Sequence, residues 1–211
     1  MKLDYQESYA RHLPHIQPPG ATLFVTFRLA GSLPLSVIDE LEAELKRDLA
    51  HIRQTADPAN QPRLLYEAQR RAFGRLDREL DKAGHGPRWL QQPAIASLVQ
   101  ESIHFLDGQK YALDCYCLMS NHGHIVFTPL EEANGRYFAI SRIMHSLKRH
   151  TATEANKRLG RKGQFWQHES YDHIVRDEAE LNRIRRYVLM NPVKAGLIES
   201  ETDWPYSWAS W

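Results

Sequence analysis

Two histidines stand at a spacing that suits the binding of a metal ion. His122 and His124 are one residue apart and lead into an apolar run that continues through Phe127. Alternate residues of a β-strand point to the same side of a sheet, so both imidazoles are expected on one face, opposite Ile125 and Phe127. Neutral imidazole nitrogens placed in this way can chelate one divalent ion if a third ligand comes from elsewhere in the fold. The alternative, two surface or hydrogen-bonded imidazoles, stays open on spacing alone.

Tyr187 and Asn191 form a second pair of residues that could take part in a reaction. They are four residues apart in a helical pattern, so the phenol and the amide share one helix face. A phenol in isolation ionises at about pH 10, and nearby cations and a metal can assist its attack on phosphorus. An ion would also polarise the phosphate and absorb charge in the transition state. Together with the histidines, this pair favours phosphodiester cleavage through a phosphotyrosine bond. The structural alternative is a tyrosine at the rim of the core and a polar helix end before Pro192.

The elements that would position these residues follow from hydrophobic periodicity. Alternation over residues 21–29 predicts a half-buried strand. Three amphipathic helices are expected after it, and Ser36 is expected to cap the first in a capping box with Asp39. The runs 111–119 and 124–130 are so close that they predict an antiparallel hairpin. Further along, we expect a helix around 138–147, a strand-like segment at 165–175 and a helix at 178–190. This order predicts an α+β fold with an antiparallel sheet.

Composition adds modest limits. The formal net charge is +1, so any affinity for nucleic acid must come from local clustering. Cys115 and Cys117 alternate in a strand-like run, which favours reduced core residues over a disulfide; a metal role for them is the weaker alternative. The segment Met1 to Glu7 lacks the apolar core of a signal peptide, and no run approaches membrane-spanning length. We therefore expect a cytoplasmic protein with no membrane partner.

Basic residues gather in one part of the chain. Between Arg142 and Lys162 there are seven lysines and arginines against the single acid Glu154. Such a run is usually a solvated helix face. Beside a glycine-flanked loop and a tryptophan, it instead indicates a track for phosphates with an aromatic stacking surface. The residues expected to contact nucleic acid are Lys148, Arg149, Arg161, Lys162, Trp166 and Arg176.

Several of these segments resemble a known family. Met119-Ser120-Asn121-His122-Gly123-His124 resembles the His-hydrophobic-His (HUH) motif of the single-tyrosine transposases, with Gly123 where the family usually has a bulky apolar residue. Four further segments are similar to the REP-associated branch of that family: Arg11 to His15, Phe24 to Pro34, the block from Phe165 through Tyr187 to Ile198, and Asp203 to Ser207. The resemblance covers most of the chain except the helical block from about residue 36 to 83.

The resemblance implies a set of roles. His122, His124 and Asn191 would hold a divalent ion, Mg²⁺ or Mn²⁺, and Tyr187 would be the nucleophile. The substrate would be single-stranded or hairpin DNA at hairpin-forming repeats, cut and rejoined by a monomer or homodimer. The tyrosine would be linked to the 5′ phosphate and a 3′ hydroxyl would be released. Two alternatives stay open: a non-catalytic nucleic-acid-binding module, and a metal-dependent hydrolase that uses water in place of the tyrosine.

The element order and the resemblance together define the expected architecture. We expect a ferredoxin-like antiparallel sheet with helices mainly on one face and an enlarged helical crossover after the first strand. A chain of 211 residues suits one domain, here 1–211, with a helical insertion at about 36–106. A tryptophan-rich C-terminal tail is expected at about 199–211. It is either a strap packed on the body or a segment that restrains access to the active site.

Overall fold

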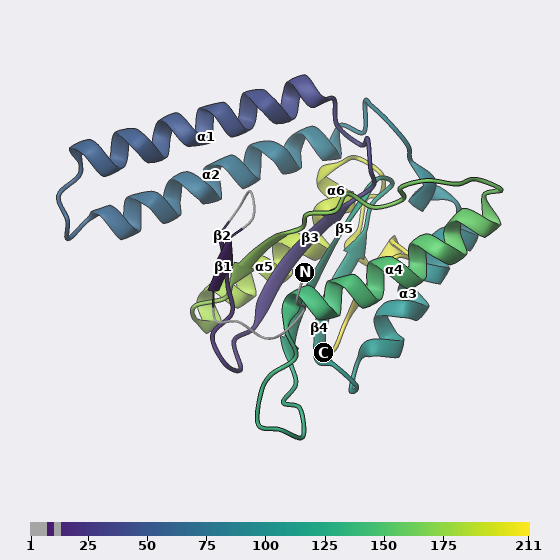
Figure 1. The fold of residues 1–211 in the computed structure, drawn as a ribbon. Helices are drawn as coiled ribbons and strands as arrows, with labels where there is room; N and C mark the ends of the chain where they lie inside the picture. Colours follow the sequence, from purple (N-terminus) through teal and green to yellow (C-terminus); the bar gives the residue numbers. More distant parts are fainter. Residues whose placement is uncertain (1–7, 11–13) are drawn as a thin grey trace. The chain divides into compact units, whose positions relative to one another are not determined.

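The structure, a computed structural model, describes residues 8–10 and 14–211. They divide into two compact units (Figure 1). The sheet unit comprises the described residues up to Ala30 together with 88–211, and the helical unit comprises 31–87. Residues 1–7 and the Arg11-His12-Leu13 part of the opening motif lie outside the described residues.

The sheet unit is built on five antiparallel strands in the order β6-β3-β5-β4-β7. β5 pairs antiparallel with both β3 and β4, so β3 and β4 run parallel to each other on either side of it. β3 in turn lies between β5 and β6. These interlocked crossovers are the ferredoxin-like arrangement, and the predicted fold class is confirmed. The strands are β3 (Leu23–Arg28), β4 (Tyr111–Leu118), β5 (His122–Pro129), β6 (Tyr171–Ile174) and β7 (Ser207–Ala209). A separate two-stranded sheet pairs β1 (Ser8–Ala10) with β2 (Pro14–Ile16).

Helices cover the two faces of the sheet unequally. α3 (Pro93–Leu106) and α4 (Ile140–Arg158) pack side by side on one face (Figure 1). The shorter α5 (Glu178–Leu189) packs against β4 and β5 on the other face and leads into α6 (Asn191–Lys194). Short 3₁₀ turns lie at Trp89–Gln91 and Glu201–Asp203. The main core lies between the sheet and helices α3 and α4. This is expected of strands in which alternate residues form one strongly apolar face.

Strand alternation decides which residues enter this core. Phe27, Ile125 and Phe127 are fully buried and belong to the main apolar cluster. Their neighbours Thr26 and His124 point to the face that α5 covers. The predicted parity of β5 is therefore confirmed. Cys115 and Cys117 are also buried as unbonded thiols, and burial raises the pKa of Cys115.

Two local predictions are wrong. The strand-like segment 165–175 contains a strand only at Tyr171–Ile174. Phe165 and Trp166 lie before it with both rings buried in the core, and Trp166 forms only an isolated bridge to Leu29. Aromatic residues that favour strands are here used as core anchors of a loop. The second error is at Ser36, which lies inside the first helical turn because the helix begins at Leu35 and no side chain caps it.

The helical unit is a pair of long helices joined by a short loop, α1 (Leu35–Thr55) and α2 (Gln61–Asp81). They lie side by side, and Arg75 of α2 forms an ion pair of 2.9 Å with Glu44 of α1 (Figure 1). The unit is shorter than the insertion expected at 36–106. The difference arises because α3 buries its apolar side in the core of the sheet unit. Among the residues that the structure describes, no helix is long and apolar enough to cross a membrane.

Candidate active site

The two histidines converge on one point. His122 and His124 both project from β5 to the α5 face, and their Nε2 atoms lie 3.2 Å apart. The ring centroids are 4.8 Å apart at an interplanar angle of 78°. Both side chains are fully buried, so they are not the surface pair that the spacing left open, and both rings are hydrogen-bonded within the protein. The arrangement brings two ring nitrogens to one point, which is the geometry of a chelating pair when both carry a lone pair.

Each imidazole is oriented by a hydrogen bond at its other nitrogen. His122 Nδ1 lies 2.7 Å from Asn121 Oδ1, a carbonyl oxygen that can only accept, so the proton is on Nδ1 and Nε2 keeps its lone pair. His124 Nδ1 lies 2.7 Å from Thr26 Oγ1. Metal-binding histidines are commonly held by such partners. Sequence reasoning missed both partners, although Thr26 interrupts an apolar strand and stands directly opposite His124 in the β3–β5 register.

Asn191 brings a third polar group to the histidines. Its Nδ2 lies 2.9 Å from His124 Nε2, and its residue is 1% exposed. Within the described part of the chain, Asn191 Oδ1 is buried and has no hydrogen-bond partner. An unpaired buried acceptor is costly, and a half turn of the amide would aim this oxygen at the histidine nitrogens. Two imidazole nitrogens and one amide oxygen fit a divalent ion, and the imidazoles favour Mn²⁺ over Mg²⁺, which prefers oxygen ligands.

Burial keeps the histidines in the form that binds metal. It lowers the pKa of His122 to about 3 and holds the pKa of His124 well below its usual value. The neighbouring His122 and Lys194 lower the pKa of His124 further. Both rings are therefore neutral near pH 7, and neutral imidazole is the ligand form.

Tyr187 lies beside this cluster near the end of α5. Its ring meets His124 edge to face at 5.7 Å between centroids and meets Phe24 at 6.1 Å. Lys194 Nζ stands 4.5 Å from the centroid of the same ring. The helix is well defined at its start, where Asp177 accepts a hydrogen bond from the Glu180 backbone. The structure therefore brings together Tyr187, Asn191 and both histidines, as the family resemblance implied.

Gly123, between the histidines, is explained by its neighbours. A Cβ at this position would lie 2.8 Å from Phe27 Cζ and 2.8 Å from Leu118 Cδ2. Phe27 is the register partner of Gly123, and the β3–β5 pairing continues without interruption on both sides. The Phe27 ring thus occupies space that a larger residue at 123 would need. The glycine does not loosen the spacing of the imidazoles, because the surrounding strand is regular.

The basic residues predicted to contact nucleic acid fall into two groups: some have partners within the protein and others are exposed. Lys148 Nζ donates to the backbone carbonyls of Gln167 and His168, at 2.9 and 3.1 Å, and so anchors the loop before β6. Arg161 stacks its guanidinium 4.0 Å from the Trp89 ring centroid and donates to Asn156. Both cations have structural partners within the protein.

Arg176 and Trp166 also have partners within the protein, although Arg176 is exposed and Trp166 is buried. Arg176 forms a two-point ion pair with Glu180, at 2.9 Å for each contact. Trp166 is 5% exposed and donates from Nε1 to Thr151 Oγ1, so the predicted stacking surface is wrong for this residue. Of the predicted set, Arg149 and Lys162 are exposed and have no side-chain partner among the residues described.

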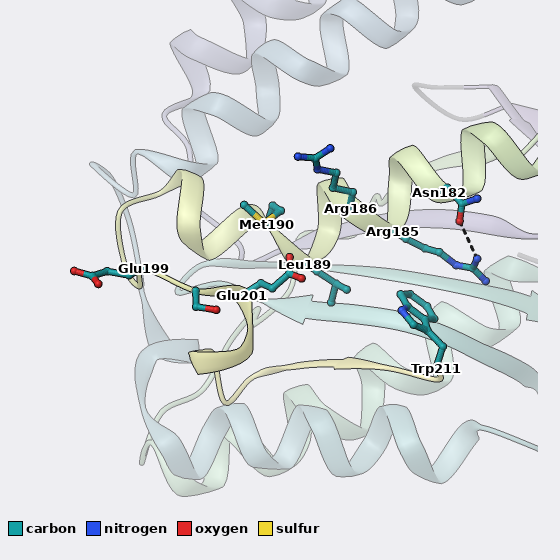
Figure 2. Close-up of a pocket in the computed structure, with 9 residues that line it drawn as sticks. Asn182, Arg185, Arg186, Leu189, Met190, Glu199, Glu201 and Trp211 are labelled. Atoms are coloured by element: carbon teal, nitrogen blue, oxygen red, sulfur yellow. Dashed lines mark hydrogen bonds between the residues drawn. The ribbon is translucent and has the colours of Figure 1, made fainter.

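The C-terminal tail packs on the body as a strap. β7 pairs with the outer edge of β4, and Trp204 Nε1 donates to the Leu118 carbonyl oxygen at 2.9 Å. Between the tail and α5 is a hollow of about 720 Å³ (Figure 2). In it, the Trp211 ring faces the Arg185 guanidinium at 4.6 Å, and Arg185 is bound to Asp114 at 2.6 Å. The lining residues are Asn182, Arg185, Arg186, Leu189, Met190, Glu199, Ser200, Glu201 and Trp211.

The structure thus combines an antiparallel sheet and a buried histidine pair with a helix that carries a tyrosine beside the pair. Residues 90–191 match the family described as "Transposase IS200 like". This segment contains His122, His124, Tyr187 and Asn191. This part of the chain is thus similar to the IS200-like transposases.

Two individual proteins sharpen this relationship. The chain is 28% identical over 96 residues to the "Putative REP-associated tyrosine transposase" of Haemophilus influenzae. That match covers 43% of this chain and 54% of the relative, so it spans about half the relative's length. The solved structure of a REP-associated tyrosine transposase bound to a REP hairpin has a TM-score of 0.54 and 16% identity, over 94% of this chain and 80% of the other. At this identity it shows a shared fold. The predicted resemblance to the REP-associated branch is confirmed.

Proposed function

We propose that this protein is a metal-dependent single-stranded DNA endonuclease and strand transferase that acts on hairpin-forming DNA through a 5′-phosphotyrosine intermediate. The observation that carries the proposal is the convergence of His122, His124 and Asn191 beside Tyr187. A buried set of neutral donors next to a half-buried phenol is poorly suited to a purely structural role, because an unpaired amide oxygen is left in it. The similarity to the transposases supports hairpin-forming DNA as the class of substrate.

The proposed reaction assigns each residue a task. His122, His124 and Asn191 hold a divalent ion such as Mg²⁺ or Mn²⁺. When bound, this ion supplies positive charge that polarises a phosphate. The Tyr187 phenol loses its proton to water and its oxygen attacks the scissile phosphorus. The bond from phosphorus to the tyrosine oxygen forms as the bond to the 3′ oxygen breaks, and the 3′ oxygen takes a proton from water. Attack by a 3′ hydroxyl on the phosphotyrosine reverses these steps and joins a strand.

The non-catalytic alternative would be favoured if Gly123, with its backbone freedom, loosened the spacing of the two imidazoles. Phe27 and Leu118 instead fill the space beside this glycine and the strand is regular, which supports the catalytic function. The alternative in which water replaces Tyr187 predicts cleaved DNA without a covalent adduct. One experiment therefore addresses all three functions.

The experiment is a test of adduct formation. Labelled single-stranded hairpin DNA is incubated with the protein and Mn²⁺, then separated under denaturing conditions. We expect a protein–DNA adduct in the parent and none in Tyr187→Phe, with DNA binding nearly unchanged because only a hydroxyl is removed. Tyr171→Phe is the matched control, since Tyr171 also contacts the Phe24 ring from the same face of the sheet. An adduct of normal yield in Tyr187→Phe would overturn the assignment of the nucleophile.

A further inference from the structure

Lys194 is a cation placed directly over the proposed nucleophile. Its Nζ is 4.5 Å from the centroid of the Tyr187 ring. The residue is exposed, and within the described part of the chain no carboxylate pairs with it. This distinguishes it from Arg176 and Arg185, which are tied to Glu180 and Asp114. Lys194 thus has an ammonium in a defined position and no anion bound to it.

The short helix α6 connects this cation to the candidate metal ligand. Asn191 and Lys194 are the first and last residues of α6, three apart and therefore on one side of a helical turn. Tyr187 stands four residues before Asn191, so the three side chains follow one face across the junction between α5 and α6. The charge of Lys194 also reaches the histidines, where it helps to lower the pKa of His124. Contacts thus link the groups in sequence: Asn191 and Tyr187 both contact His124, and Lys194 lies over the Tyr187 ring.

We propose that Lys194 is a further catalytic residue, which binds the scissile phosphate and holds it against the Tyr187 oxygen. This inference rests on the proposed function. A phosphate attacked by Tyr187 must lie beside the phenol oxygen, and the ammonium stands 4.5 Å from the centroid of that ring, within reach of such a phosphate. A lysine is a compact point charge suited to a non-bridging phosphate oxygen, and charge on these oxygens must be balanced during transfer. Lys194 gives up no proton in this step. It pairs with the phosphate while the tyrosine–phosphorus bond forms and the bond to the 3′ oxygen breaks.

The aromatic ring beneath the ammonium explains why a flexible side chain can serve this role. A cation over an aromatic face is attracted by the ring, which reduces the freedom of the long lysine stem. The competing explanation is that Lys194 only packs on Tyr187. In that case its loss would change packing but would not depend on a charge in the substrate.

The first test needs no DNA cleavage. Inorganic phosphate is titrated into the protein, and binding is followed by NMR shifts of the backbone amides of 193–196. Lys194→Met removes the charge at similar length, Lys194→Arg keeps it, and Lys157→Met is the matched control on a lysine paired with Glu154. We expect Lys194→Met to weaken phosphate binding about tenfold, while Lys194→Arg and the control stay within about twofold of the parent. Equal binding in the parent and Lys194→Met, or no shift at these amides in the parent, would overturn the proposal.

The second test asks whether the charge that Lys194 meets is that of the scissile phosphate. The cleavage position in a hairpin is first mapped with the parent. Binding of DNA with either a phosphodiester or an uncharged methylphosphonate at this position is then measured in a Tyr187→Phe background. We expect Lys194→Met to cost about tenfold with the diester and no more than about twofold with the methylphosphonate. Equal losses on the two DNAs would contradict contact with this phosphate. If the parent forms no adduct, the proposed function fails, and the phosphate titration still decides the role of Lys194.

Discussion

The histidine pair and the basic segment 142–162 were both predicted to bind a ligand. In the structure the histidine nitrogens converge on one point, whereas several of the basic side chains contact the protein itself. At the pair, each imidazole has one nitrogen held by a neighbour and the other directed to a common point. In the basic segment, Lys148 and Arg161 instead direct their charges into the protein itself. Strand geometry fixes where alternate side chains point, whereas a long cationic side chain can find a carbonyl, a ring or a phosphate. A count of charges is therefore a weaker guide to binding than the spacing of two histidines.

The largest effect that would sharpen this comparison is expected from His124→Ala. The change removes a proposed ligand that also contacts Asn191 and the Tyr187 ring. We expect cleavage to fall at least about 100-fold at ordinary Mg²⁺ or Mn²⁺ and to recover in part at high metal concentration, because the remaining ligands bind weakly. Single-turnover cleavage and calorimetric Mn²⁺ titration measure the two effects. His145→Ala, on the exposed side of α4, is the matched control. Mn²⁺ binding as tight as in the parent would make His124 structural.

Trp166→Ala tests a residue that was predicted to contact DNA and is instead buried in the core. It would leave a cavity beside Phe27 and Phe165, whose rings meet Trp166 at 5.0 and 4.9 Å. We expect a loss of roughly 3–5 kcal/mol in the free energy of unfolding, measured by urea denaturation. Where the variant remains folded, the salt dependence of its DNA binding should equal that of the parent. A stable variant with a reduced salt slope would restore the stacking role.

The pH dependence of the histidine pair gives a further prediction. Burial lowers the folded-state pKa of His122 to about 3, while the unfolded chain takes up a proton near about pH 6.5. Between these values the unfolded state binds more protons, so stability rises with pH and is lost progressively as the pH falls from about 6.5 toward 3. The measurement is urea unfolding of the metal-free protein at several pH values in this window.

The same shift predicts how metal binding responds to acid. Mn²⁺ affinity of the folded protein should change little between about pH 7.5 and about pH 5, because few protons compete for rings that stay neutral. An exposed pair with ordinary pKa values would lose affinity over this range. A steep fall in affinity near pH 6.5, measured by calorimetry, would show that the rings are more accessible to protons than their burial indicates.

The sequence was sufficient for features that depend on local periodicity. The third of the expected amphipathic helices is α3 (Pro93–Leu106), whose ends have clear local signals because a proline begins it and Asp107-Gly108 follow it. The opposite faces of His124 and Phe127 follow from strand alternation. Features that depend on which strands pair were not accessible. Thr26 became a partner of His124 only through the β3–β5 register, and Asn121 through the tight connection before β5. Trp166 was misplaced because an exposed and a buried tryptophan have the same local sequence signal.

Arg149 and Lys162 provide the finest test of the basic segment. Both are exposed, whereas Lys148 and Arg161 are engaged by the protein. Each phosphate contact that is lost should reduce the slope of log affinity against log salt by about 0.7 for a single strand, so Arg149→Ala with Lys162→Ala should reduce it by about 1.4. The measurement is a salt titration of hairpin binding by the parent and this double variant.

The matched comparison is Lys148→Ala with Arg161→Ala, which removes the same formal charge. If these two residues only hold the loop at 163–170 in place, their loss should lower the free energy of unfolding and leave the salt slope nearly unchanged. Affinity in the Arg149 and Lys162 variant should fall for any DNA sequence, because phosphate contacts position a strand without reading its bases. Cleavage at saturating DNA should survive, since neither residue lies at the histidine pair. Equal slopes in all three proteins would mean that the strand does not follow this segment and that the exposed cations form only a solvated face.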